Sequence, residues 1–162
     1  MTVNEVKELL NIYYDIPQMI DEEFATIRHC EEQKDRINLP SVNLSGMPGG
    51  KGVPGDRTAN MALADQARYY EDEIMNCYRR IAELREKRDW VRTALDTLER
   101  VDRQILRLAY IGPADPRRRR GWRPPTWDEI GQSVHYSKGQ AWNRSVRAIF
   151  YLSNKSLQID MS

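Results

Sequence analysis

The sequence predicts an all-α protein: a long antiparallel helical hairpin or coiled coil that is joined to a small C-terminal helix-turn-helix module. Three observations lead to this prediction. Apolar residues follow a heptad pattern over about five heptads, charge is divided unequally along the chain, and two short helices with cap signals follow each other near the C-terminus. We expect residues 1–101 to form the hairpin and residues 102–155 to form the module.

The first segment, from Thr2 to about Asn38, places its apolar residues at steps of three, four or seven, and therefore on one helical face. Pro17 lies inside this pattern. Because proline has no N–H and clashes with the preceding turn, we expect the helix to kink or split near Asp15. A connector rich in glycine and proline follows at about residues 39–57. Its stretch GMPGGKGV lacks the spacing of a phosphate-binding loop, so nucleotide binding is not predicted.

A helix of roughly 40 residues comes next and would be about 60 Å long, which is too long to bury itself. It needs a partner, which is either the first segment returning antiparallel or a second copy of the chain in a homodimer. The sequence does not choose between them. We interpret Cys77 as a core residue of this helix. The heptad seam Leu63–Leu98 consists of Leu63, Ala67, Tyr70, Ile74, Cys77, Ile81, Leu84, Arg88, Val91, Leu95 and Leu98.

The net charge of +1 hides a strong asymmetry. Residues 1–102 hold 14 basic and 20 acidic residues, whereas residues 103–155 hold 11 basic and three acidic residues. The C-terminal part is therefore strongly cationic, which favours binding to a polyanion there.

The C-terminal part carries the signals of three helices. Asp102 is the expected N-cap of the first helix, which Gly112 and Pro113 terminate. Thr126 and Glu129 form the S/T-x-x-E capping box of the second helix, and Ser137 is the expected cap of the third. Two short helices joined by a tight turn form a helix-turn-helix pattern, whose second helix enters the major groove of DNA.

The third helix is rich in the residue types that recognise base edges, since Lys and Arg pair with guanine, and Asn and Gln with adenine. We predict base contacts from Lys138, Gln140, Asn143, Arg144 and Arg147. The same helix carries an apolar stripe, which Trp142, Val146, Ile149 and Phe150 are expected to widen. We predict an irregular basic segment before the second helix, mobile without DNA and ordered with it, and phosphate contacts from Arg117, Arg118, Arg119, Arg120, Arg123 and Ser137.

The C-terminal residues resemble region four of sigma-70-type transcription factors, through the stretches ERVDRQILRLAYI and TWDEIGQSVHYSKGQAWNRSVRAIFYL. The chain as a whole resembles the ArpU/RinA-like phage and prophage regulators of late-gene transcription. The resemblance implies a sequence-specific regulator that binds double-stranded DNA, with RNA polymerase as a candidate partner. The chain departs from the sigma pattern in the long connection between Ile111 and Pro125, and in Arg144, which stands where an apolar residue is usual.

Other classes of function are weighed against this one. A phage DNA-packaging subunit similar to a small terminase would also join a helix-turn-helix to an oligomerising helix, and a coiled-coil adaptor is a further alternative. His29 and His135 lie in different modules, without a catalytic or metal-ligand signature, so we predict no enzyme, no cofactor and no metal. No apolar run could span a membrane, and neither a signal peptide nor a disulfide framework is evident, so we expect an intracellular protein. The resemblance to phage regulators implies the cytoplasm of a bacterial host cell.

Overall fold

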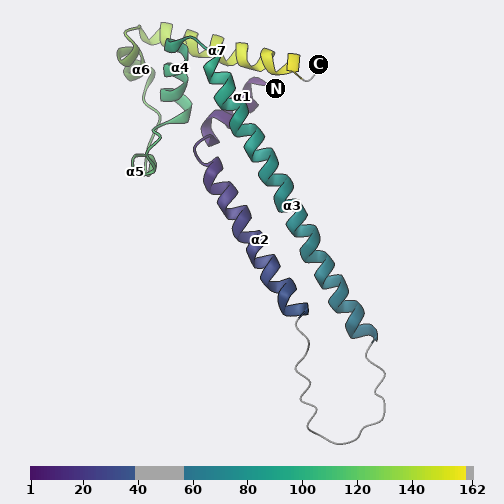
Figure 1. Ribbon diagram of the computed structural model, residues 1–162. Coiled ribbons are helices and arrows are strands. Elements are labelled where there is room, and N and C mark those ends of the chain that lie inside the picture. The colour runs from purple at the N-terminus through teal and green to yellow at the C-terminus, as the bar shows by residue number, and fades with distance from the viewer. Residues whose placement is uncertain (39–56, 160–162) are drawn as a thin grey trace, which may run out of the picture. The chain divides into compact units, whose positions relative to one another are not determined.

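The computed structural model describes residues 1–38 and 57–159, and within these ranges the chain is helical and contains no strand. The predicted all-α class is confirmed. A connector rich in glycine and proline was expected at 39–57, and its residues 39–56 lie outside the described part of the chain. The helices are α1 (Val3–Ile12), α2 (Ile16–Asn38), α3 (Arg57–Asp96), α4 (Arg100–Leu106), the π-helix η1 (Arg107–Ile111), α5 (Pro116–Arg119), α6 (Trp127–Val134) and α7 (Lys138–Ile159) (Figure 1).

The predicted break near Asp15 is confirmed. Helix α1 ends at Ile12 and α2 begins at Ile16, so that Pro17 lies in the first turn of α2, where its missing N–H costs nothing. Helix α1 starts with a capping box, in which the Thr2 side chain accepts a hydrogen bond from the Glu5 amide and the Glu5 carboxylate accepts one from Thr2.

The chain forms two compact units, and they do not divide it at residue 101. The first unit joins residues 1–17 to the chain from Leu84 onward, and the second comprises residues 18–83. The expected boundary between 101 and 102 is therefore displaced. The reason is that α1 and the end of α3 bury their apolar faces with the C-terminal helices, rather than with the hairpin.

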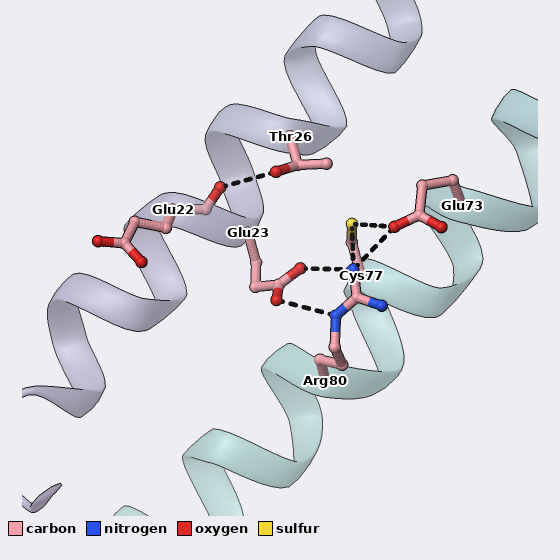
Figure 2. Close-up of polar contacts among 6 residues, drawn as sticks. All are labelled: Glu22, Glu23, Thr26, Glu73, Cys77 and Arg80. Carbon is pink, nitrogen blue, oxygen red and sulfur yellow. Dashed lines mark hydrogen bonds and ion pairs between the residues drawn. The ribbon is translucent and has the colours of Figure 1, made fainter.

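The second unit is the antiparallel hairpin, in which the α2 and α3 segments run side by side (Figure 1). Arg80 on α3 donates to both carboxylate oxygens of Glu23 on α2 at 2.8 and 2.9 Å, and it also donates to Glu73 at 2.9 Å (Figure 2). The hydrogen bonds from Arg80 hold the pKa of Glu23 below its ordinary value. A second pair, Lys34 with Glu71 at 2.8 Å, joins the same two helices.

Cys77 is completely buried in this hairpin, as its seam position predicts. Burial raises the pKa of its thiol to about 11. Because the thiolate is the reactive form of cysteine, this environment disfavours a nucleophilic role, and Cys77 packs as a small core residue.

The heptad seam Leu63–Leu98 is closed within the chain over much of its length. Cys77 and Ile81 are buried in the second unit, and Val91, Leu95 and Leu98 are buried in the first. Toward the start of α3 the seam becomes open, and Leu63 is 44% exposed. The chain's own helices thus bury six seam positions, which are Cys77, Ile81, Leu84, Val91, Leu95 and Leu98.

The core of the first unit joins the two ends of the chain. Leu10 on α1, Leu95 on α3 and Ile149 on α7 belong to one buried cluster, together with Val6, Leu9, Val91, Ala94, Leu98, Leu106, Ile111, Ala148 and Leu152. Since Ala148, Ile149 and Leu152 all lie in the middle of α7, this core fixes the helix whose first turns carry the predicted base contacts.

A second cluster in the same unit holds the helix-turn-helix together, and it consists of Ile105, Ala109, Ile130, Val134 and Ala141.

The prediction that Asp102 is the N-cap of the first C-terminal helix is wrong. Helix α4 begins at Arg100 after Glu99, and Asp102 lies in the first turn with its carboxylate turned to Arg144. The helix continues as η1, where the Gly112 amide donates to the Arg107 carbonyl at 2.9 Å, and Gly112 ends it with a φ of 76°.

Candidate nucleic-acid interface

The turn between α6 and α7 is tight and depends on a glycine. His135 ends α6 in the left-handed region, with φ 59° and ψ 39°, and the Tyr136 amide donates to the Gly131 carbonyl at 2.9 Å. A Cβ added at Gly131 would lie 2.7 Å from the Tyr136 carbonyl oxygen and 3.2 Å from the Lys138 nitrogen. The backbone of the turn therefore packs directly on α6, at a distance that only glycine permits.

Two capping boxes fix where the helices begin. The predicted box of α6 is confirmed: the Glu129 amide donates to the Thr126 hydroxyl at 3.3 Å, and the Thr126 amide donates to Glu129 at 2.7 Å. The hydrogen bond from the Thr126 backbone holds the pKa of Glu129 below its ordinary value. The start of α7 repeats this arrangement with Ser137 and Gln140. The Ser137 amide donates to the Gln140 side-chain oxygen at 3.0 Å, and the Gln140 amide donates to the Ser137 hydroxyl at 3.3 Å.

Asn143 and Arg147 are exposed on α7, and their side chains make no hydrogen bond or ion pair with the described part of the chain. Lys138 is also exposed and pairs with Asp128 of α6 at 3.3 Å. Gln140 is exposed, but its side-chain oxygen is engaged by the cap at Ser137. The described structure thus places four of the five predicted base-reading residues on the solvent side of α7.

Arg144 is the exception, because it points toward α4. Its Nε donates to Asp102 at 2.5 Å, its Nη2 donates to Glu99 at 2.7 Å, and its guanidinium lies over the Tyr136 ring at 5.4 Å. The hydrogen bonds to Asp102 and then to Glu99 raise the pKa of Arg144. The predicted base contact from Arg144 required a side chain that faces solvent beside the other four residues, and this expectation is corrected. The Arg144 side chain is 27% exposed and joins α7 to α4.

Replacing Arg144 with Ala is expected to lower the free energy of unfolding by about 1–2 kcal/mol, because hydrogen bonds to charged groups that retain some solvent contact contribute amounts of this order. Urea denaturation followed by circular dichroism would measure the change. Arg147→Ala is the matched control, because Arg147 is exposed and makes no bond within the described chain. It is expected to change stability by less than about 0.5 kcal/mol. Equal effects of the two changes would contradict the role of Arg144 as a tie.

The arginine-rich segment contains a one-turn helix, α5, and is thus not wholly irregular as expected. The Asp115 side chain accepts a hydrogen bond from the Arg117 amide at 2.9 Å, and Pro116 occupies the first helical position. Arg119 is ion-paired with Asp15 and lies over the Tyr14 ring at 5.4 Å. Arg119 therefore already has a partner within the chain, which corrects the expectation of a segment that is wholly mobile without DNA.

The remaining predicted phosphate contacts lie in solvent. Arg117, Arg118 and Arg120 are exposed, and Arg118 makes only a long 3.9 Å contact with Asp115. Arg123 is exposed and lowers the pKa of Glu129 by its charge. Ser137 is exposed, although its hydroxyl serves as the cap of α7.

Three apolar residues of α7 differ from expectation. Trp142, Val146 and Phe150 were expected to widen the buried stripe together with Ile149, but only Ile149 is buried. Trp142 is 49% exposed, Val146 is 46% exposed and Phe150 is 59% exposed.

A second basic cluster, which was not predicted, lies on α4 and η1. Arg100, Arg103, Gln104 and Arg107 line a hollow of about 420 Å³. Arg103 also donates to the Asp96 and Leu98 carbonyls at 3.2 Å, so one member is anchored to the end of α3. The sequence contains a signal for this cluster, because the three arginines are spaced three and four residues apart and therefore share one helical face.

Comparisons with known proteins add no relative. No protein-family model, curated protein or solved structure matches this sequence. No helix among residues 1–38 and 57–159 has the length and apolar character needed to cross a membrane.

Proposed function

We propose that this protein binds double-stranded DNA in a sequence-specific manner, with α7 in the major groove, and that it acts by binding rather than by catalysis. One observation carries the proposal. The start of α7 presents Lys138, Asn143 and Arg147 to solvent, on a helix that two cores and a tight turn hold in place. The residue types match direct readout of guanine and adenine edges, and helix-turn-helix proteins place such a helix in the groove.

The charge of the surrounding surface supports the same proposal. Lys138–Ile159 contains four basic residues and no acidic one. The segment before α6 adds four exposed arginines, which are Arg117, Arg118, Arg120 and Arg123. The basic cluster on α4 and η1 adds Arg100 and Arg107. Phosphate contacts from such residues position a protein on the duplex, whereas base contacts specify the sequence.

The finer assignment is a regulator of phage or prophage late-gene transcription, for which the resemblance of the C-terminal residues to sigma region four is the support. Contact with RNA polymerase belongs to the same proposal. The packaging alternative predicts a large ring in solution, whereas a regulator is expected to be a monomer or dimer. Sedimentation equilibrium of the full chain distinguishes the two.

The test of DNA binding is selection of bound sites from random duplexes with the full chain, followed by titration of the selected operator. Asn143→Ala and Arg147→Ala are each expected to weaken operator binding about 5- to 150-fold, which corresponds to the roughly 1–3 kcal/mol of a specific base contact. Binding to random DNA should fall much less. Arg85→Ala on α3 is the control for loss of one exposed positive charge. Selection that enriches no sequence, or equal losses on operator and random DNA, would contradict sequence-specific readout.

A further inference from the structure

The outward face of α7 mixes apolar and polar side chains in a pattern that the fold does not require. Gly139, Asn143, Val146 and Phe150 follow each other at steps of four, three and four, and therefore share one helical face. Arg147 borders the same face, since it is one residue from Val146 and four from Asn143. We call these five residues the outward face.

The apolar members of the outward face take no part in either core. The buried side of α7 consists of Ala141, Ser145, Ala148, Ile149, Leu152 and Ser153. Val146 and Phe150 remain about half exposed, with Trp142 beside them at the edge. Large apolar side chains in a contiguous exposed group are typical of a contact surface.

Gly139 gives an independent indication that a surface approaches here. A Cβ at Gly139 would meet no atom within 4 Å, and its φ is not positive. Glycine costs up to about 1 kcal/mol relative to alanine in a helix interior. Gly139 lies in the first turn of α7, and neither packing nor a positive φ requires a glycine there. A glycine does permit close approach of the backbone to a ligand.

The charges indicate which kind of surface approaches. Among the basic residues of helix α7, Arg144 is paired with Asp102 and Glu99, and Lys138 is paired with Asp128. Arg147 makes no ion pair within the described residues, and it lies with Asn143 in the outward face itself. A polyanion complements the unpaired positive charge of Arg147, and helix α7 has no acidic side chain that would repel it. In the major groove of DNA, the apolar group that a duplex offers is the 5-methyl group of thymine.

We propose that Val146 and Phe150 contact thymine 5-methyl groups, beside the bases that Asn143 and Arg147 hydrogen-bond. The operator then contains thymine at the positions next to those bases. This inference rests on the proposed function and adds to it the chemical identity of the recognised bases.

The experiment replaces each thymine of the selected operator in turn with uracil, which keeps the base pair and removes only the methyl group. Loss of a contacted methyl is expected to weaken binding of the unaltered protein about fourfold, which corresponds to the ~0.8 kcal/mol of one buried CH₂ group. Val146→Ala and Phe150→Ala should each bind the thymine operator more weakly. Each should also lose the sensitivity to uracil at one position.

Tyr151→Ala is the matched control, because Tyr151 is an exposed aromatic residue of the same helix that lies about 100° around it from Phe150. It should keep the full sensitivity to uracil. Circular dichroism of each variant checks that the helices are retained.

Three results would overturn the inference. Uracil could be tolerated at every position of a well-bound operator, or the Val146 and Phe150 variants could remain as sensitive to uracil as the unaltered protein. The two variants could instead change the mass of the protein in solution and leave operator affinity intact, which would assign the face to a protein partner. Each of these leaves sequence-specific binding itself in place. Failure to select any operator contradicts both proposals.

Discussion

Replacing Gly131 with Ala is expected to lower the free energy of unfolding by about 1–3 kcal/mol, the usual cost of overpacking. The added methyl group would lie 2.7 Å from the Tyr136 carbonyl oxygen, and a backbone atom cannot move aside as a flexible side chain can. Because Tyr136 and Ser137 lead into α7, relief of the clash must shift α7 relative to α6. We expect operator affinity to fall together with stability, as measured by urea denaturation and by titration.

Gly139→Ala provides the matched control, since it is the same substitution in the next helix at a site with open space. Here alanine is expected to raise the free energy of unfolding by up to about 1 kcal/mol through helix propensity. The two alanine changes should therefore act on stability with opposite signs. Destabilisation by both to the same extent would show that the close contact at Gly131 does not govern the turn.

Replacing Arg117, Arg118 and Arg120 together with Ala is expected to flatten the salt dependence of DNA binding. Each phosphate contact contributes about 0.9 to the slope of log K against log salt, so three contacts should reduce its magnitude by about 2.7. The loss should be equal on operator and random DNA, because phosphates carry no sequence information. Titrations between 50 and 200 mM salt, the range over which such losses are large, would measure it.

Arg119→Ala is the comparison for this triple change. Arg119 is only 22% exposed and is paired with Asp15, so its loss should alter the salt slope less than loss of any one of the three exposed arginines. It should affect stability instead. If the triple variant keeps the salt dependence of the unaltered protein, Arg117, Arg118 and Arg120 do not contact DNA phosphates. The basic cluster on α4 and η1 would then be the main candidate for phosphate contacts.

Local signals made much of the fold predictable. The capping box at Thr126 and Glu129, the break at Pro17 and the buried seam positions from Cys77 onward each depend on residues within a few turns of one another. Backbone donors at a helix start need a partner nearby, and proline acts on its own turn, so such features are written in short stretches of sequence.

Contacts between distant segments were not predictable in the same way. The inward position of Arg144 depends on Asp102 in α4 and on Glu99 just before that helix. The departure of Arg144 from the apolar pattern was a signal, but its partner could not be identified. The exposure of Val146 and Phe150 likewise depends on how α7 is rotated against α4 and α6, which periodicity alone does not fix.

The packing of α1 against α7 has a consequence for how the chain is made. Leu10 leaves the ribosome long before Ile149 and Leu152, which belong to the same buried cluster. The hairpin of residues 18–83 has all its partners in the first half of the chain and can form during synthesis. The first unit must wait for α7, and until then α1 exposes the apolar face that α7 will cover. The first unit therefore closes after the hairpin, through a contact between segments that lie far apart in the sequence.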